Sequence, residues 1–283
     1  MKARPPAFAG SWYAGTSQEL RKQIEGCFTH KLGPGNLPKV AKNGPRKILG
    51  LVSPHAGYMY SGPVAAHGYY RLAADGKPDV VVILSPNHTG RGSALAIMKE
   101  GIWRTPLGDV EIDTPVAETI LRESGIIDID EKAHAYEHSI ELQLPFLQYL
   151  YGSSFKFVPI CFLMQDLESS REVGKAVAEA LSQQNAVVIA STDMTHYEPH
   201  ESAKRKDEMA INAAAKLDEG EYYSIVESHG ISTCGYGPVV AAITAAKKLG
   251  GKRGQLLCYK TSGDITGDYS AVVGYASLSF VKS

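Results

Sequence analysis

The sequence predicts an α/β fold in which buried strands alternate with amphipathic helices. Residues 80–84 are five consecutive apolar side chains, four of them β-branched, which is typical of a strand covered on both faces. One pattern occurs three times, at 48–55, 80–88 and 186–196. In each case an apolar strand is followed by a Ser and then by a His or an Asp. Residues 166–184 carry apolar side chains at every fourth position, as an amphipathic helix does. These observations favour an open α/β sheet with buried strands.

Composition agrees with one large domain, which we expect to span residues 1–283. The chain is 44% hydrophobic and 21% charged, with a formal net charge of -1, and it has no clustered basic stripe of the kind that binds nucleic acid. Its longest apolar runs are about strand length, so no membrane span is predicted. The N-terminus lacks the apolar run of a signal peptide, and the four cysteines form no C-x-x-C pair. We therefore expect a cytoplasmic protein without a disulfide framework.

Helix signals recur between the strands. Ser17 and Thr114 are residue types that cap helix N-termini. Pro63 and Pro115 are expected in first turns, where a missing amide donor costs little, whereas Pro145 should kink or divide the helical segment around it. The predicted helices, in chain order, are 17–28, 62–72, 114–124, 166–184, 200–216, 219–228 and 239–249.

Strand signals complete the pattern. The predicted strands are 48–52, 80–84, 93–98, 109–112, 156–162, 186–190, 255–261 and 271–281. The last two have the composition of antiparallel strands and are expected at the edge of the sheet. Residues 1–16 are loop-like, and the aromatic residues within 8–13 either seal the edge of the core or line a pocket.

Polar side chains follow three of the strands at the point where each strand ends. His55 follows the first, His88 the second, and Asp193 and His196 the third. In open α/β sheets, ligands bind at the carboxyl ends of the strands, where side chains from several strands converge. Each residue alone is best explained as a polar strand cap, but three repetitions favour one shared site.

A fourth element of the site is Cys234, at the entrance to the Ala-rich helix 239–249. Amide dipoles at a helix N-terminus lower a thiol pKa and favour the thiolate that binds metal. Two strand-end imidazoles and one thiolate make three metal ligands with an open position, as catalysis requires. Thiolate favours softer metals, and imidazole suits iron, copper and zinc alike. Asp193 and His196 would then serve as supporting or acid–base groups.

A rival motif lies at His134-Ala-Tyr-Glu137-His138, which matches the H-x-x-E-H pattern of inverted zinc peptidases. That pattern needs both histidines on one helix face. Here no amphipathic helix leads into Ser139, which is a better candidate for a helix cap. Glu137 and His138 are therefore expected to approach the strand-end pocket, with His138 as a base. Glu141 bonding to loop amides is an equally favoured structural alternative.

These motifs resemble those of a known family, the Memo family, whose archaeal and bacterial members are also called AmmeMemoRadiSam system protein B. The resemblance covers essentially the whole chain in matching order. It is carried by Phe-Ala-Gly-Ser-Trp-Tyr (8–13), Pro-His-Ala-Gly-Tyr (54–58), Pro-Asn-His (86–88), Glu-His-Ser-Ile-Glu (137–141), Ser-Thr-Asp (191–193) and Thr-Cys-Gly (233–235).

The resemblance implies the three-layer αβα sandwich, with a mixed central sheet, of LigB-like class III extradiol dioxygenases. It implies a metal position formed by His55, His88 and Cys234, and it matches Asp193 and His196 to the family's third strand end. In those dioxygenases the third ligand is a glutamate, so Cys234 departs from the ring-cleaving pattern.

The family also suggests partners. Animal relatives are described as iron- or copper-binding redox proteins that act in cell-motility signalling and bind phosphotyrosine peptides. Glu198 and Glu201 make an acidic neighbourhood here that is unsuited to phosphate, so this role is not transferred. The microbial name reflects genes beside a radical-SAM protein, which implies a shared pathway.

Three functional hypotheses follow. The first is a mononuclear metal-binding, dioxygenase-like redox enzyme, with Fe(II) as the expected ion, copper or zinc as alternatives, and a small-molecule or peptide ligand. The second is a binding or scaffold protein that retains the pocket without turnover. The third is a zinc peptidase that uses His134, Glu137 and His138.

Overall fold

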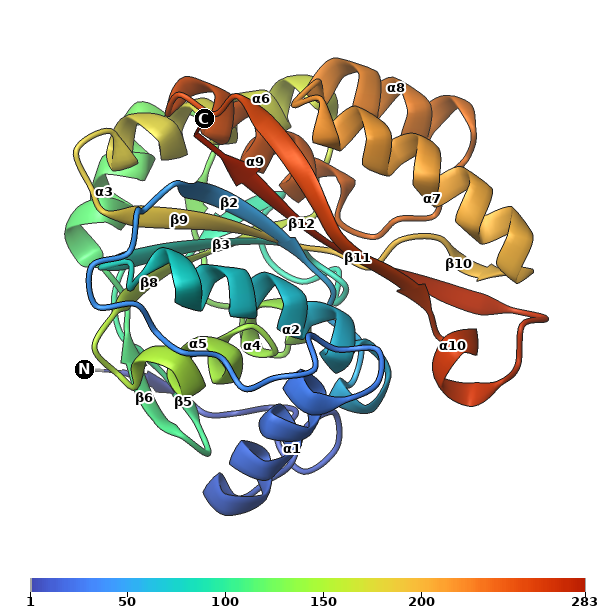
Figure 1. Cartoon of the computed structure of the whole chain (residues 1–283). Coiled ribbons are helices and arrows are strands. Elements are labelled where there is room, and N and C mark those ends of the chain that lie inside the picture. Colours follow the sequence, from blue (N-terminus) through green and yellow to red (C-terminus); the bar gives the residue numbers. More distant parts are fainter. Residues whose placement is uncertain (1, 283) are drawn as a thin grey trace.

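The centre of the molecule is a nine-stranded mixed sheet with helices on both faces (Figure 1). The computed structural model describes residues 2–282. Its strands are β1 (Ala3–Arg4), β2 (Ile48–Ser53), β3 (Val80–Pro86), β4 (Leu95–Ile97), β5 (Ile102–Thr105), β6 (Gly108–Glu111), β7 (Asp128–Ile129), β8 (Lys156–Phe162), β9 (Ala186–Ser191), β10 (His196–Glu198), β11 (Arg253–Thr261) and β12 (Val272–Val281). Its helices are α1 (Ser17–Thr29), α2 (Tyr58–Asp75), α3 (Thr114–Glu123), α4 (His138–Glu141), α5 (Leu144–Tyr151), α6 (Leu167–Leu181), α7 (His200–Ala215), α8 (Glu219–Ser228), α9 (Tyr236–Lys248) and α10 (Gly263–Thr266).

The strand order confirms the predicted αβα fold with a mixed sheet. The order is β10-β12-β2-β9-β3-β8-β4-β7, with β11 paired to β12. Strands β2, β9, β3 and β8 are parallel neighbours, whereas β12 joins β2, and β4 joins β8, in antiparallel fashion. The last two strands are antiparallel, as predicted. Of these two strands, only β11 lies at an edge of the sheet, because β12 also pairs with β2 and β10.

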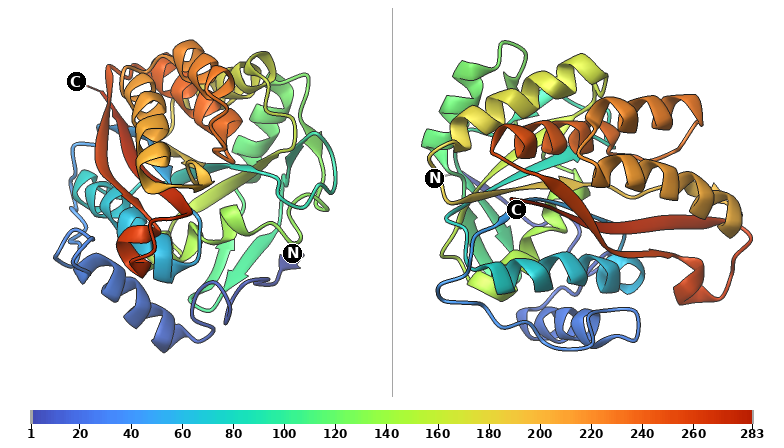
Figure 2. Two further views of the ribbon diagram at one scale, coloured as in Figure 1. Left: turned by 90° about the vertical axis from the view of Figure 1, so that its right-hand side faces the viewer. Right: turned by 45° about the horizontal axis from the view of Figure 1, so that its top comes forward.

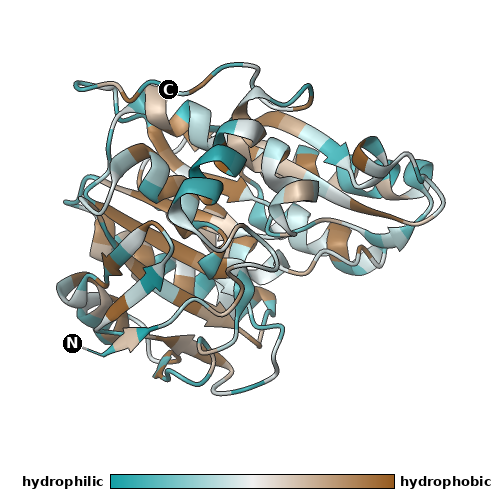
Figure 3. Cartoon of the chain, turned by 90° about the horizontal axis from the view of Figure 1, so that it is seen from below, coloured by the Kyte–Doolittle hydropathy of each residue, from teal (hydrophilic) through white to brown (hydrophobic). Residues whose placement is uncertain are grey.

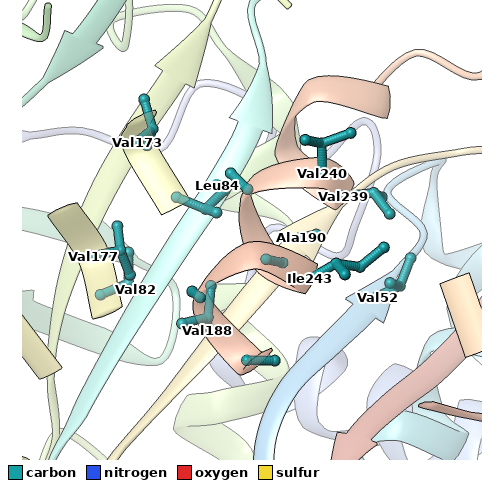
Figure 4. Close-up of a cluster of buried hydrophobic side chains, with 14 of the residues drawn as sticks. Val52, Val82, Leu84, Val173, Val177, Val188, Ala190, Val239, Val240 and Ile243 are labelled. Carbon is teal, nitrogen blue, oxygen red and sulfur yellow. The ribbon is translucent and has the colours of Figure 1, made fainter. Parts of the chain in front are cut away.

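The sheet separates two hydrophobic cores, because alternate side chains of a strand point to opposite faces. In β3, Val82 and Leu84 pack on the face covered by α6 and α9, where they meet side chains such as Val177 and Ile243 (Figure 4). Val81 lies in the other core, together with side chains of α1, α2 and α5. Figure 2 shows α1 lying outside α2 on this second face, and Figure 3 shows the apolar strands at the centre of the molecule.

Three predicted helix caps were wrong by one or two residues. Thr16, not Ser17, caps α1 by accepting the amide of Glu19, and Asp113, not Thr114, caps α3. Glu137, not Ser139, caps α4 by accepting the Ser139 amide. In each case an oxygen-bearing side chain immediately precedes the helix and reaches its free amides.

The start of α2 was also predicted too late. The helix begins at Tyr58, whose amide donates to the carbonyl of Trp12 at 2.9 Å, so Pro63 lies inside it rather than in its first turn. The chain therefore becomes helical only three residues after His55.

No helix among residues 2–282 is long and apolar enough to cross a membrane.

A small second sheet fixes the N-terminal segment; the sequence predicted its strand at 109–112 but not its other two strands. Strand β1 pairs in parallel with β5, which is antiparallel to β6. The two-residue length of β1 gives no periodicity to detect. This sheet anchors the segment that leads to the aromatic residues at 8–13.

Candidate metal centre

The carboxyl ends of three neighbouring strands converge as predicted. His55, His88 and Asp193 each stand two residues beyond the last residue of β2, β3 and β9. Cys234 reaches the same point from the loop before α9. One donor atom from each of His55, His88 and Cys234 lies within 4.8 Å of the others. The structure thus brings together the three residues predicted to hold a metal.

His55 has a defined tautomer. Its Nδ1 lies 2.9 Å from Ser191 Oγ, which donates its own proton to the Ser139 carbonyl at 2.8 Å and accepts the Gln143 amide at 2.8 Å. Because the Ser191 proton is already used, Nδ1 of His55 must donate to it. The Nε2 lone pair is therefore free, and it faces Cys234 Sγ at 3.2 Å.

Gln143 holds the Ser191 hydroxyl, and through it the His55 ring, in position. Its Nε2 donates to the Pro54 carbonyl at 3.1 Å, and its Oε1 accepts the Tyr69 hydroxyl at 2.5 Å. A carbonyl can only accept, so the amide cannot be turned over. Sequence reasoning missed Gln143 and assigned no role to Ser191. The available signal was a glutamine within the otherwise apolar run 142–147, which is buried and so needs partners.

His88 is oriented by a carboxylate instead. Glu137 Oε1 lies 2.9 Å from Nδ1 of His88, and Oε2 accepts the His88 amide at 2.6 Å. Burial opposes ionisation of Glu137, but its bonds with His88 and the Ser139 amide hold its pKa at about 2. The carboxylate therefore accepts the Nδ1 proton and leaves Nε2 of His88 available, an arrangement common for metal-binding histidines.

The prediction that Cys234 has a lowered pKa was wrong. Burial, reinforced by the charge of Asp193, raises the pKa of the thiol well above its ordinary value. The Asp193 amide does donate to Sγ at 3.2 Å, but this bond does not outweigh the loss of solvent. A bound cation would reverse this balance, because a coordinating thiol is deprotonated outright.

The donor set fits a metal ion. Burial, together with the neighbouring His138, His88 and His196, lowers the pKa of His55 well below its ordinary value, so this imidazole is neutral. One imidazole nitrogen from each of His55 and His88 and the Cys234 sulfur lie together at the convergence point. Neutral imidazole and thiolate are the forms that bind zinc, copper and iron.

Glu137 and His138 form a second candidate group with His88. Glu137 Oε1 already accepts the Ser139 amide at 2.9 Å and the Ser139 hydroxyl at 2.7 Å besides the His88 proton. Its oxygens are therefore occupied, and Glu137 acts as the partner that orients His88. His138 stacks on His88 with ring centroids 4.4 Å apart, and burial lowers its pKa to about 4.

An aromatic wall closes one side of the site. The ring of Trp12 lies 4.3 Å from that of His138, and Phe8 packs edge-on against both rings. Tyr13, by contrast, is buried in the core. The segment 8–13 therefore has both of the roles that the sequence left open. Tyr13 seals the core, and Trp12 lines the site.

Glu141 holds this wall in place. Its buried carboxylate accepts the amides of Ala7 at 3.0 Å and Phe8 at 2.9 Å, the hydroxyl of Tyr13 at 2.7 Å, and the guanidinium of Arg4 at 2.6 Å. The predicted bonding of Glu141 to loop amides is confirmed. Because both charges are buried, removing either partner alone would leave the other without compensation.

The structure contradicts the zinc peptidase hypothesis. His134 is completely buried, its Nδ1 lies 2.9 Å from the Asp130 carbonyl, and it belongs to neither metal-binding group among the described residues. Residues 132–136 form a turn, and α4 begins only at His138. His134 and His138 therefore do not share a helix face.

Asp193 and His196 flank the donor set without joining it. Asp193 Oδ1 accepts the His55 amide at 2.8 Å, and burial raises the pKa of this carboxyl to about 6. His196 Nδ1 lies 2.8 Å from the Ser232 carbonyl, which can only accept, so Nδ1 donates this hydrogen bond. Their roles as supporting or acid–base groups stay predictions.

The fold and site define an αβα protein with a His–His–Cys donor set at the carboxyl edge of its sheet. The family model described as "Memo-like protein" matches residues 4–279, and the chain belongs to the Memo family. It is 56% identical over 279 residues to a MEMO1 family protein from Methanopyrus kandleri, covering 98% of both chains. It is 51% identical over 278 residues to one from Methanothermobacter thermautotrophicus, covering 98% of this chain and 99% of the relative.

A solved structure shares the fold at low sequence identity. This is the crystal structure of an uncharacterized protein from Escherichia coli K12, with a TM-score of 0.56 and 14% identity. The likeness covers 82% of this chain and 99% of that one. It therefore supports the architecture alone.

Proposed function

We propose that this protein is a mononuclear metal-binding, dioxygenase-like redox enzyme that holds its metal with His55, His88 and Cys234. The supporting observation is the convergence of the two histidines with Cys234 while both Nδ1 atoms donate to other partners. Two Nε2 lone pairs and one sulfur are thereby left for a single ion. Three protein ligands leave further coordination positions open.

Fe(II) is the proposed ion, with copper and zinc as alternatives that the same ligands suit. When bound, the ion supplies Lewis acidity and, for iron or copper, electron transfer at its open positions. The protein's own part is to orient the ligands, through Ser191 for His55 and Glu137 for His88. A bound cation would compensate the negative charge of the Cys234 thiolate, which burial otherwise disfavours.

Protons would be handled by the groups around the donor set. His138 is a neutral imidazole stacked on His88, so it is placed to take a proton from a ligand bound at an open position. His196 donates through Nδ1 to the Ser232 carbonyl, and Asp193 holds the backbone of His55. The ligand proposed for this pocket is a small organic molecule or peptide, and the proposed location of the protein is the cytoplasm.

Metal analysis of protein purified without oxygen tests the proposal directly. The wild type should carry close to one equivalent of metal, and His55→Ala, His88→Ala and Cys234→Ala should each lose most of it. Cys27→Ala is the matched control, since Cys27 is a buried cysteine of α1 outside both metal-binding groups. A metal-free wild type that cannot be reloaded, or a Cys234→Ala variant that retains its metal, would refute the proposal.

A second candidate function is a binding or scaffold protein without turnover. Cys234 favours it, because the family's ring-cleaving relatives use a carboxylate at this place. Catechols and other aromatic diols, offered with Fe(II) and oxygen, separate the two functions. Sustained product formation that disappears in His88→Ala would exclude the scaffold, whereas stoichiometric binding without product would favour it.

A further inference from the structure

Among residues 2–282, three non-glycine residues adopt a positive φ angle, which costs a side-chain-bearing residue free energy. They are Arg46 (φ 47°), Leu217 (φ 57°) and Tyr197 (φ 58°). Such strain persists only where the surrounding structure compensates for it, so each case calls for a reason.

Two of the three have an internal reason. The guanidinium of Arg46 donates to Asn185 Oδ1 at 2.6 Å and to Asp75 Oδ2 at 3.2 Å, which ties together the start of β2 and the end of α2. Leu217 is 5% exposed and belongs to the core beneath α7 and α8. Hydrogen bonding in one case and burial in the other therefore compensate the backbone cost.

For Tyr197, neither side-chain hydrogen bonding nor burial compensates the backbone cost to a similar extent. Its side chain is 78% exposed, more than any other large hydrophobic side chain among residues 2–282. Its backbone forms a bulge, because His196 pairs with Val273 and Glu198 with Val272, leaving Tyr197 as the extra residue. Bulges of this kind re-aim side chains and are frequent beside functional sites.

The bulge presents Tyr197 next to His196, a residue that flanks the candidate metal centre. Its ring meets that of His196 edge-on, with centroids 5.8 Å apart. Burial first, and then the nearby Asp193, Tyr60 and Tyr197, raise the pKa of the Tyr275 phenol. Tyr60 is itself 37% exposed at the start of α2, five residues after His55.

We propose that Tyr197 is a ligand-contacting residue whose exposed ring packs against the outer, planar part of an organic ligand. The polar head of that ligand binds the metal held by His55, His88 and Cys234. The left-handed backbone at Tyr197 is retained because it directs the ring toward the bound ligand rather than into the core. This inference rests on the proposed metal centre.

Two hydroxamates test the inference on the full chain loaded with Co(II). Acetohydroxamate and benzohydroxamate share one metal-binding head and differ in the ring that would reach Tyr197. In the wild type we expect benzohydroxamate to bind more tightly. In Tyr197→Gly its affinity should fall by about 3- to 10-fold, as expected for a lost aromatic contact, while that of acetohydroxamate stays unchanged. Tyr197→Phe should keep the wild-type preference.

Arg46→Gly is the matched backbone control. It relieves the same strain but removes the hydrogen bonds of Arg46, so its melting temperature should fall while both hydroxamate affinities remain. Tyr197→Gly should show the reverse, with a melting temperature at or above that of the wild type and a weakened benzohydroxamate complex.

Two results would overturn the inference. If the wild type binds acetohydroxamate but Tyr197→Gly binds benzohydroxamate as tightly as the wild type does, Tyr197 contacts no ligand and the metal centre stands. If the Co(II)-loaded wild type binds neither hydroxamate, the metal has no open coordination position for a ligand, and this inference is refuted as well.

Discussion

His55 and His88 reach one point from two strands that are separated by β9, but they are oriented by different chemistry. His55 donates to a neutral hydroxyl, Ser191, which is supported by the amide of Gln143. His88 donates to the ionised carboxylate of Glu137. A carboxylate partner makes the imidazole a stronger base than a hydroxyl does, so the two ligands are not equivalent. We therefore predict that His88 would bind a metal ion more strongly than His55 would.

The largest expected effect comes from removing the charged partner. In Glu137→Gln, one of the two accepting oxygens becomes an NH2 group, which meets a donor of His88 in either orientation, Nδ1 or the backbone amide. His88 therefore loses the carboxylate that orients it. We expect Zn(II) affinity to fall by about 100-fold, at the upper end for such partners. Competition with a chromophoric chelator measures it. A loss of less than about threefold would show that the carboxylate does not support the metal.

Removing the neutral partner should have a smaller effect. Ser191→Ala deletes the acceptor for Nδ1 of His55 and should weaken Zn(II) binding by about 10-fold. Ser279→Ala is the control, because Ser279 is a buried β12 serine whose hydroxyl has no partner among the described residues. An equal or larger loss in Ser191→Ala than in Glu137→Gln would reverse the ranking of the two histidines.

A double variant sharpens the comparison. Ser139 donates to Glu137 through its amide and hydroxyl, and its carbonyl accepts from Ser191, so the two partners are coupled. In Glu137→Gln with Ser191→Ala, the combined loss of Zn(II) affinity should differ from the product of the two single losses by about threefold or more. Strict additivity would mean that the two histidines are held independently.

The smallest effect is expected at His138. His138→Phe keeps the ring stacked between Trp12 and His88, and it removes no metal ligand of the proposed set. Zn(II) affinity should therefore change by less than about twofold. If affinity instead fell as far as in Cys234→Ala, His138 would have to be counted among the ligands.

Much of this architecture is readable from the sequence. The apolar runs that become β2, β3 and β9 are long enough to identify, and the residues two positions beyond their ends are the ones that converge. The chain turns polar there because a buried parallel strand cannot carry such groups cheaply. Cys234 was found in the same way, from its place before an Ala-rich helix.

Other features depend on tertiary contacts that no local pattern encodes. Burial decides the pKa of Cys234, and it outweighs the helix dipole that the sequence suggested. Gln143 matters only because Pro54 and Tyr69 lie within its reach. The positive φ angle of Tyr197 has no compositional signature, because tyrosine is not a residue that favours this conformation.

Ser139 has a consequence that extends beyond the two histidines it links. Its three polar groups fasten both imidazole supports to one helical turn, α4, which spans only His138–Glu141. The far end of that turn, Glu141, grips the N-terminal segment that carries Trp12. A rotation of this turn would therefore tilt both imidazole rings and displace the aromatic wall together.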